Sequence, residues 1–401
     1  MKAGLAAIAG LIMCNVLSAQ QPFSIADSNN LFAFKLYGEL KKDTKENLFF
    51  SPFSISSALA MTYAGARNET EKQMCHTLHF SSDQNAFHKA YKTYLEKIES
   101  DTGKDLALRV ANSLWIANSF ELLKPFSEIE AADYKAESYN VAFSPPAAIE
   151  DTRLQINYWV EQRTKKKIKD LIPPGILDLS TKLVLVDAIY FKGKWKIAFS
   201  KDSTKMGEFY ADNTGSVNAD FMHTTANYKY YEDNVLQAIE FPYSGDKLSM
   251  VVFLPKKRDG IEEMNSKIDY AFYTKIVSGF LMSGTRKVIV ALPKFKTTAE
   301  FRMAGTLSAM GMPDAFSPGL ADFKGMSTDQ LCISQVIHKA FIEVNDEGTE
   351  AAAATAVIMK MMMSPIRTPL FIADHPFVFV IRDNATGGIL FMGKISNTVK
   401  E

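Results

Sequence analysis

The segment 346–377 constrains the fold of this chain most. It lies between two apolar runs, 333–345 and 377–393, yet it is neither polar enough nor rich enough in glycine and serine to be a linker. Pro365 and Pro369 near its end favour a loop over a regular element. Loops of this length are uncommon inside a compact domain and usually have a function. We therefore expect the rest of the chain to be organised around this loop.

An extended conformation would give residues 349–362 two different faces. One face carries both charges, Glu350 and Lys360, and the other carries only uncharged side chains. This alternation is typical of a strand with one face on a core. Because alanine is the best helix former, the run 350–356 fits a helix as well, and periodicity leaves both structures open. The uncharged face consists of Thr349, Ala351, Ala353, Thr355, Val357, Met359 and Met361.

The composition narrows the function classes. Lys and Arg total 45 and Asp and Glu also total 45, so the formal net charge is zero. A neutral chain has no overall field that attracts nucleic acid or an anionic membrane, and we predict neither as a partner. Beyond the N-terminus, no stretch is long and uncharged enough to span a bilayer. The 401 residues, 47% of them hydrophobic, can bury a large core in one domain or in two or three.

Residues 1–19 are typical of a secretory signal peptide. Lys2 supplies a positive start, residues 3–17 are apolar, and Ala19 is a small residue suited to cleavage. We expect a mature chain, 20–401, that is secreted and extracellular, or periplasmic or at the cell surface if the source is bacterial. Its two remaining cysteines, Cys75 and Cys332, form either one disulfide or two thiols, and the sequence leaves both open.

Local patterns predict an α+β fold. Helical patterns crowd the N-terminal half and strand patterns the C-terminal half, which favours α+β over alternating βαβ units. Ser51 and Pro52 form a good helix start and Gly65 suits its end. No internal repeat or linker divides the chain. Predicted helices are 24–40, 52–65, 69–78, 83–98, 126–134 and 149–172, and predicted strands are 47–50, 106–116, 182–191, 235–241, 248–254 and 287–292.

Four motifs, in order along the chain, resemble those of the serpin family. They are N-L-F-F-S-P-F-S-I-S-S-A-L-A-M (47–61), L-V-L-V-D-A-I-Y-F-K-G-K-W (183–195), V-I-H-K-A-F-I-E-V-N-D-E-G-T-E-A-A-A-A-T-A (336–356) and D-H-P-F-V-F-V-I-R-D-N-A-T-G-G-I-L-F-M-G-K-I (374–395). The resemblance covers nearly the whole mature chain. It implies a single serpin domain, 20–401, with three β-sheets, about nine helices and an exposed reactive-centre loop at about 346–370.

The resemblance also implies a function. The chain would be a suicide-substrate inhibitor of serine proteases, or in some members of cysteine proteases, rather than an enzyme. The protease forms an acyl-enzyme on the loop, and the freed loop then inserts into the central sheet. Small residues and an uncharged face suit insertion, because no charge is buried. The alternative is a non-inhibitory binding, chaperone or storage protein on the same fold. The implied hinge is Glu347, Gly348, Thr349, Glu350, Ala351, Ala352, Ala353 and Ala354.

Two further sites in the central sheet follow from the resemblance. One is a shutter, where the sheet opens, formed by Ser54, Asp187 and His338, and the other is a breach at Trp195. Asp187 departs from the family pattern, which has asparagine there. A carboxylate beside an imidazole favours its charged form. Two alternatives stay open: Asp187 only accepts the hydrogen bonds that asparagine would accept, or it makes the shutter depend on pH.

Family spacing predicts the reactive bond. Fourteen residues after Gly348 the bond lies between Met362 and Met363, and a register one residue shorter makes Met361 the residue before the bond. Methionine suits proteases with a medium-sized apolar S1 pocket, such as elastase-, chymotrypsin- or subtilisin-like enzymes. Lys360 would suit a trypsin-like enzyme but lies two residues too early.

Other chemistry has less support in the sequence. No G-x-S-x-G, H-E-x-x-H or G-x-x-x-x-G-K-[ST] motif is present, and we expect neither catalytic residues nor a cofactor. Cys75, His76 and His79 lack a fourth ligand, so we expect no metal site. The basic runs 165–169 and 256–258 are either solvated surfaces or a site for a sulfated polysaccharide (a glycosaminoglycan). We expect a monomer.

We expect elastase to cut the loop after Met362 and to release a C-terminal fragment that begins at Met363, because methionine fits an apolar S1 pocket. Intact-mass measurement of the fragment identifies the bond. A fragment that begins at Met361 would make Lys360 the reactive residue and contradict the predicted specificity.

Overall fold

A computed structural model describes residues 24–43, 45–99, 105–211, 215–349 and 368–398, and it has the predicted α+β class. The predicted signal peptide lies outside the described residues. A π-helical turn (Glu130–Tyr134) and two 3-10 turns (Lys201–Ser203, Asp314–Phe316) supplement the α-helices. The nine α-helices of the described part are α1 (Ile25–Asp43), α2 (Pro52–Tyr63), α3 (Asn68–Leu78), α4 (Gln84–Glu99), α5 (Lys124–Ile129), α6 (Pro146–Arg163), α7 (Ile261–Asn265), α8 (Tyr270–Ser283) and α9 (Met303–Met310).

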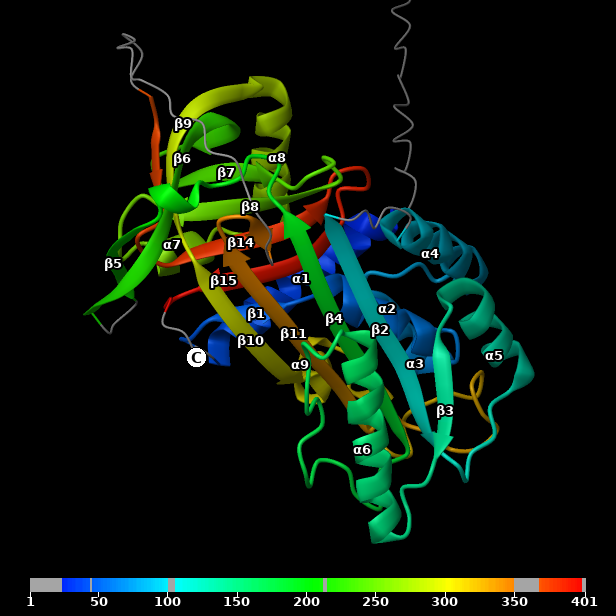
Figure 1. The fold of residues 1–401 in the computed structure, drawn as a ribbon. Coiled ribbons are helices and arrows are strands. Elements are labelled where there is room, and N and C mark those ends of the chain that lie inside the picture. Colours follow the sequence, from blue (N-terminus) through cyan, green and yellow to red (C-terminus); the bar gives the residue numbers. More distant parts are fainter. Residues whose placement is uncertain (1–23, 44, 100–104, 212–214, 350–367, 399–401) are drawn as a thin grey trace, which may run out of the picture.

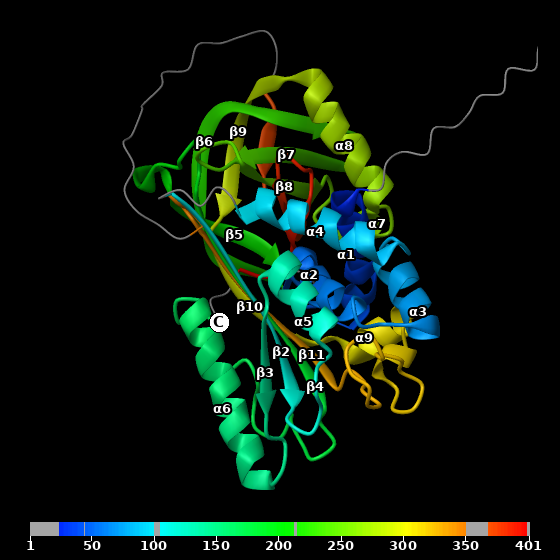
Figure 2. The ribbon, with the colours of Figure 1, turned by 90° about the vertical axis from the view of Figure 1, so that its right-hand side faces the viewer.

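A six-stranded sheet runs through the middle of the molecule (Figure 1). Helix α6 lies on one of its faces, and α2 and α9 lie on the other (Figure 2). The strands follow the order β10-β11-β12-β4-β2-β3. Their bounds are β10 (Phe295–Arg302), β11 (Gln335–Asn345), β12 (Gly348–Thr349), β4 (Leu183–Lys194), β2 (Leu106–Ala117) and β3 (Glu137–Val141).

A nine-stranded network of strands forms the rest of the β-structure. Its order is β1-β15-β14-β8-β7-β6-β9-β13, and β5 also pairs with β6. The long strand β6 joins two arms, because its first part pairs with β5 and β9 and its last residues pair with β7. These arms correspond to the second and third sheets of the predicted three-sheet fold. The bounds are β1 (Leu48–Phe50), β5 (Lys205–Ala211), β6 (Gly215–Glu232), β7 (Leu236–Pro242), β8 (Leu248–Pro255), β9 (Thr285–Pro293), β13 (Leu370–Ile372), β14 (Phe377–Asp383) and β15 (Ile389–Ile395).

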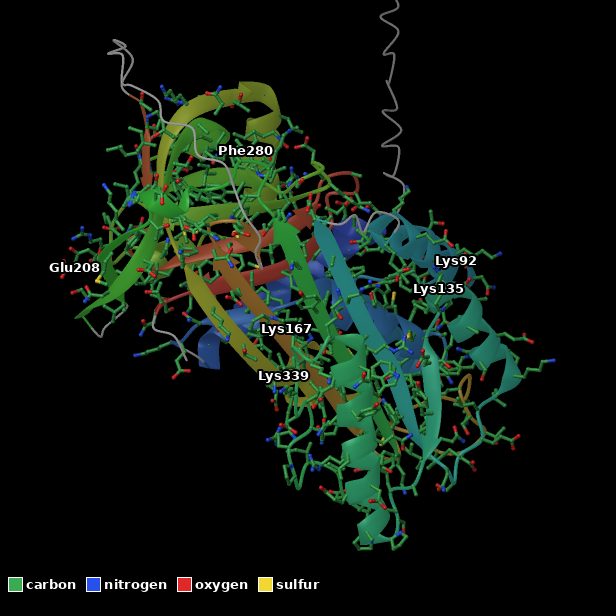
Figure 3. The ribbon with its side chains drawn as sticks, in the orientation of Figure 1. Lys92, Lys135, Lys167, Glu208, Phe280 and Lys339 are labelled. Atoms are coloured by element: carbon green, nitrogen blue, oxygen red, sulfur yellow. The ribbon has the colours of Figure 1, made fainter. Side chains whose placement is uncertain are left out.

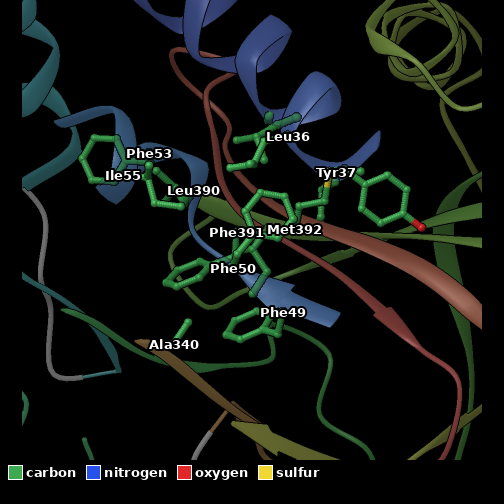
Figure 4. Packing of buried hydrophobic residues seen from close by; sticks show 14 of the residues in the cluster. Leu36, Tyr37, Phe49, Phe50, Phe53, Ile55, Ala340, Leu390, Phe391 and Met392 are labelled. Carbon is green, nitrogen blue, oxygen red and sulfur yellow. The ribbon is translucent and has the colours of Figure 1, made fainter. Parts of the chain in front are cut away.

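Buried side chains from both sheets meet in the main core (Figure 4), where the ring of Phe191 in β4 lies 5.6 Å from that of Phe391 in β15, measured between centroids. Phe49 of β1 stacks on Phe379 and on Phe391, with ring centroids 5.9 and 5.4 Å apart. Such pairs stabilise a core beyond the area that they bury. A smaller core under α6 includes Ile156 from the helix and Ile337 from β11. The six-stranded sheet is therefore packed on both faces.

Helix α2 follows its sequence signals closely. The Ser51 hydroxyl accepts the Ser54 N–H at 3.1 Å as an N-cap, and Pro52 occupies the first turn. All twelve residues of α2 are buried, since the helix lies under the sheet. Gly65 follows the helix, where a Cβ atom would lie 2.7 Å from the Cβ of Met326.

Two predicted helices have different bounds in the structure. The helix predicted over 149–172 ends at Arg163, because Lys165 and Lys166 adopt positive φ angles of 51° and 59°. The Thr164 hydroxyl donates to the Val160 carbonyl at 2.8 Å and the chain then turns back. The helix predicted over 126–134 is instead α5 followed by the π-helical turn.

Several strands lack a clear signal in the sequence. Strands β3, β5, β6, β10 and β13 fall outside the predicted runs. In β6, polar and exposed residues alternate irregularly with buried ones. Pairing along both of its edges, rather than its own apolar pattern, holds this strand in the sheet.

A buried carboxyl lies in the π-helical turn beneath β3. Glu130 is 2% exposed, and its Oε2 accepts a hydrogen bond from the Ser138 hydroxyl at 2.6 Å. Its Oε1 is buried without a partner among the described residues. Burial raises the pKa of Glu130 to about 7, and the Ser138 hydrogen bond only partly offsets this. The native state therefore favours the neutral carboxyl.

We expect a pH-dependent stability from Glu130. Its native pKa lies above its unfolded value, so its contribution is full below about pH 4 and declines as the pH rises to about 7, by on the order of 3 kcal/mol. Glu130→Gln should flatten the curve of denaturation midpoint against pH between pH 5 and 8. Glu128→Gln, at an exposed position nearby, serves as the control. Parallel curves for wild type and Glu130→Gln would contradict this account.

Candidate functional site

The predicted hinge begins inside the six-stranded sheet. Gly348 and Thr349 form β12, which lies between β11 and β4 and pairs antiparallel with both. Gly348 stands opposite Asn345 of β11 and Lys194 of β4. The first residues of the loop are therefore already a short central strand at one end of this sheet.

The same two strands pair directly along the rest of their length. From Gln335 opposite Val184 to Phe341 opposite Tyr190, β11 and β4 form a parallel ladder. Past this ladder the strands separate and β12 fills the space between them. The sheet is thus closed over most of its length and open at one end, where the loop leaves it.

Glycine is required at position 348. The residue has a φ of +145°, and a Cβ atom there would lie 2.1 Å from the Gly193 carbonyl oxygen and 2.6 Å from the Lys194 Cα. Both contacts are to backbone of the neighbouring strand, which cannot move aside like a flexible side chain. Any other residue would push β12 out of the opening.

Two buried carboxylates precede this glycine. Asp346 is 4% exposed and its Oδ2 lies 2.6 Å from Lys294 Nζ, while Glu347 is 3% exposed and its Oε1 lies 2.5 Å from Lys201 Nζ. Burial alone would raise the pKa of Asp346, but hydrogen bonds from Lys294 and Thr204 outweigh it and lower that pKa. These ion pairs fix the chain at the start of the hinge, just before Gly348.

The predicted breach residue, Trp195, supports the same place. It is 4% exposed and its ring stacks on Tyr243, with centroids 4.7 Å apart at an angle of 12°. Its Nε1–H donates to the Asn345 carbonyl at 3.0 Å, and its backbone N–H donates to the Glu347 carbonyl at 2.9 Å. Trp195 therefore binds the backbone on both sides of Asp346.

The three predicted shutter residues meet in the middle of the closed ladder. Asp187 Oδ1 accepts from the Ser54 hydroxyl at 2.7 Å and lies 2.8 Å from His338 Nδ1. All three residues are fully buried. The structure thus brings α2, β4 and β11 together through one carboxylate oxygen.

The bonding of His338 defines its tautomer. Its Nε2 accepts the Ser51 N–H at 3.1 Å, so Nδ1 carries the proton and donates to Asp187. Protonation of Nε2 would set one N–H against another and break the bond to Ser51. The pH dependence of the shutter stays a prediction.

Sequence reasoning missed several contributors to these sites. Ser51 was expected only as a helix cap, yet it also binds His338 and donates to the Leu390 carbonyl at 2.6 Å. Asn112 of β2 lies 3.3 Å from the Ser54 hydroxyl. Lys201 and Lys294 were not predicted as partners of the hinge. The only signal in the sequence was the pair Asp346 and Glu347, because two adjacent carboxylates that become buried need cationic partners.

Some predicted site residues lie outside the described residues. They are Glu350, Ala351, Ala352, Ala353, Ala354, Met361, Met362 and Met363.

The structure also bears on the predictions about a disulfide, a metal site and a membrane span. Cys75 and Cys332 are free thiols, so the disulfide alternative does not hold. Among the described residues no cluster of three or more His, Cys, Asp or Glu side chains suits a metal ion. A search of the same residues finds no helix able to cross a membrane.

The two basic runs differ in their partners. In 256–258 each side chain pairs with a carboxylate: Lys256 with Glu232 at 3.3 Å, Lys257 with Glu263 at 3.7 Å and Arg258 with Asp374 at 3.0 Å. In 165–169, Lys167 lies over the Phe341 ring at 5.8 Å, and the Lys169 carbonyl accepts from Lys339 at 3.0 Å (Figure 3). The first run is therefore neutralised, and part of the second packs on β11.

Comparison with known proteins identifies the family. The model of the family "Serpin (serine protease inhibitor)" matches residues 27–398. The chain belongs to the serpin family. Serpin B6 of Macaca fascicularis is 39% identical over 377 residues, which cover 93% of this chain and 99% of that protein.

Solved structures superpose on most of the chain. The thermophilic serpin tengpin in its native state has a TM-score of 0.83 at 30% identity, covering 93% of this chain and 94% of that one. Human thyroxine-binding globulin, solved with its ligand, has a TM-score of 0.84 at 29% identity, covering 94% and 99%. The serpin fold predicted from the four motifs is confirmed.

We expect the shutter to depend on the acceptor that Asp187 provides. Asp187→Ala leaves the Ser54 hydroxyl and the His338 Nδ1–H unpaired in a buried site and should lower the free energy of unfolding by about 2–5 kcal/mol. Asp187→Asn keeps an acceptor oxygen and should lose less than half as much. Urea denaturation of the three proteins measures the difference, and equal losses in both variants would contradict the role of this oxygen.

Proposed function

We propose that this serpin inhibits a serine protease as a suicide substrate. The observation that carries the proposal is the position of β12, because Gly348 and Thr349 already pair with both strands that would receive the rest of the loop. A loop that starts within the opening needs no separate nucleation step to insert. Each further residue can pair next to the last.

The register of β12 supports continued insertion. Thr349 stands opposite Val344 of β11 and Gly193 of β4. Extending this register down the sheet sets position 352 between Phe341 and Tyr190, which now pair with each other. The new strand would therefore separate β11 from β4 without changing their relative register.

The same register assigns the faces of the inserted strand. Position 355 would lie between Asp187 and His338, whose side chains face α2 and the main core. Odd-numbered residues from 349 to 361 would share this inward face. All of these odd-numbered residues are uncharged, while Glu350 and Lys360 would face the other way. Insertion would thus bury no charge in the main core.

Protease chemistry would start the process. The nucleophilic serine attacks the carbonyl of Met362, the bond to Met363 breaks, and the amine of Met363 leaves as the acyl-enzyme forms. Insertion of 349–362 makes a strand about 46 Å long, which carries the acylated protease along the sheet. We propose Met362–Met363 as the reactive bond, or Met361 in the shorter register, and a target with an apolar S1 pocket.

A carrier function is the second candidate. The similarity to thyroxine-binding globulin, at a TM-score of 0.84, favours it, since that relative binds a small ligand. The small, uncharged hinge residues favour the inhibitor instead. We also propose secretion through the signal peptide 1–19 and action as a monomer, and the lysines of 165–169 stay the candidate contact for a sulfated polysaccharide.

We expect Thr349→Arg to convert the inhibitor into a substrate, because the arginine would have to enter the core face of the sheet. A protease from a panel of elastase, chymotrypsin, cathepsin G and subtilisin should then cleave the variant without forming a complex stable in denaturing gels. The yield of complex should fall at least about tenfold relative to wild type.

Glu350→Arg is the matched control. In the proposed inserted strand the side chain of residue 350 would face away from the main core, so this variant should form the complex as wild type does. Undiminished complex formation by Thr349→Arg, or equal losses in both variants, would contradict the insertion account.

A further inference from the structure

Strand β13 is the first strand after the loop and lies at the edge of the nine-stranded network. It exposes two large aliphatic side chains. Leu370 is 47% exposed and Ile372 is 43% exposed, while Phe371 between them is fully buried. β13 pairs in parallel with β9, Leu370 opposite Ile289 and Ile372 opposite Ala291 (Figure 1). Side chains of paired residues share a face, so the half-buried Ile289 extends the apolar surface onto the next strand.

This surface has little charge. Continuing across the sheet, β6 presents the exposed Thr225 opposite Ile289, and His223 opposite Ala291. Burial, and to a smaller extent the charge of Lys205, lowers the pKa of His223 and so disfavours the charged form of its ring. Lys287, opposite Asn227, is the nearest charged residue on the same face of these three strands. The aliphatic residues therefore offer an apolar contact with a polar edge.

The open edge of β13 is not suited to receive another strand. The Leu370 carbonyl accepts a hydrogen bond from Gln237 Nε2 at 2.8 Å, and the Ile372 carbonyl accepts one from the Asp374 N–H at 2.9 Å. The carbonyl groups that an added strand would need are already bonded. Contact through the exposed side chains is the remaining mode.

The predicted reactive bond is close enough along the chain for a bound protease to contact this surface. Leu370 lies eight positions after Met362, and this length of chain spans at most about 29 Å. A protease domain of roughly 230 residues has a radius of about 20 Å. A protease whose active site holds Met362 is therefore large enough to reach the region that β13 occupies.

We propose that Leu370, Ile372 and Ile289 form a second docking contact for the body of the protease bound at the reactive loop, against an apolar patch beside its active site. This contact rests on the proposed inhibitory function. It would stabilise the encounter complex before acylation and favour proteases that have such a patch among those with the same S1 preference.

The test uses the protease that wild type traps fastest in the panel of elastase, chymotrypsin, cathepsin G and subtilisin. Leu370→Ser/Ile372→Ser should slow complex formation about tenfold, and should weaken binding of the same protease with its catalytic serine replaced by alanine about tenfold. Thermal unfolding of the variant should match that of wild type. Leu370→Val/Ile372→Val should stay within about threefold of wild type, because the surface remains apolar.

Leu179→Ser/Leu320→Ser is the matched control, with side chains 57% and 64% exposed. Leu179 precedes the start of β4, whereas the hinge lies at its end, so this control leaves the loop side of the molecule unchanged. If the β13 variant and this control bind the inactive protease equally well, the proposed contact is overturned. Trapping of the active protease by wild type would in that case still support the inhibitory function. No trapping by wild type would overturn that function itself. A concentration-dependent dimer of wild type, absent in the β13 variant, would assign the surface to self-association and overturn the proposal.

Discussion

The parallel ladder between β11 and β4 is the constraint on which this structure depends. His338 and Asp187 lie opposite each other within it, and their hydrogen bond joins β11 to β4 and, through Ser54 and Ser51, to α2. The bond is fully buried, where an unpaired partner would be costly. As long as it holds, the sheet stays closed below the hinge.

The opening between β11 and β4, past the end of their ladder, is where the sheet can accept a further strand. Gly348 fits between β11 and β4 because it lacks a Cβ atom, and the ion pairs of Asp346 and Glu347 hold the chain at that point. Before cleavage the loop is fixed at both ends, since the chain re-enters the fold at β13. We infer that cutting the loop frees its first part to extend β12, replacing one parallel ladder by two antiparallel ones, which are slightly more stable per residue.

Much of this account could be read from the sequence, and the rest needed tertiary contacts. The motif around Asp187 and His338 predicted the shutter, and Ser51–Pro52 predicted the start of α2. The partners Lys201 and Lys294 could not be predicted, because isolated lysines give no signal of which carboxylate the fold brings near. Strand β6 gave no clear pattern, since pairing on both edges stabilises it. The end of α6 depended on Lys165 and Lys166 adopting positive φ, which favours residues other than lysine.

Thermal unfolding before and after a single cut in the loop tests the central claim most directly. Full insertion of 350–362 would add a central strand to the six-stranded sheet, with hydrogen bonds along both of its edges. We predict that the protein cut at Met362–Met363, with its two fragments still associated, unfolds at a temperature at least about 20 °C above that of the intact chain, a shift larger than single stabilising changes produce. An unchanged unfolding temperature would contradict the account, because it would mean that the freed loop stays outside the sheet.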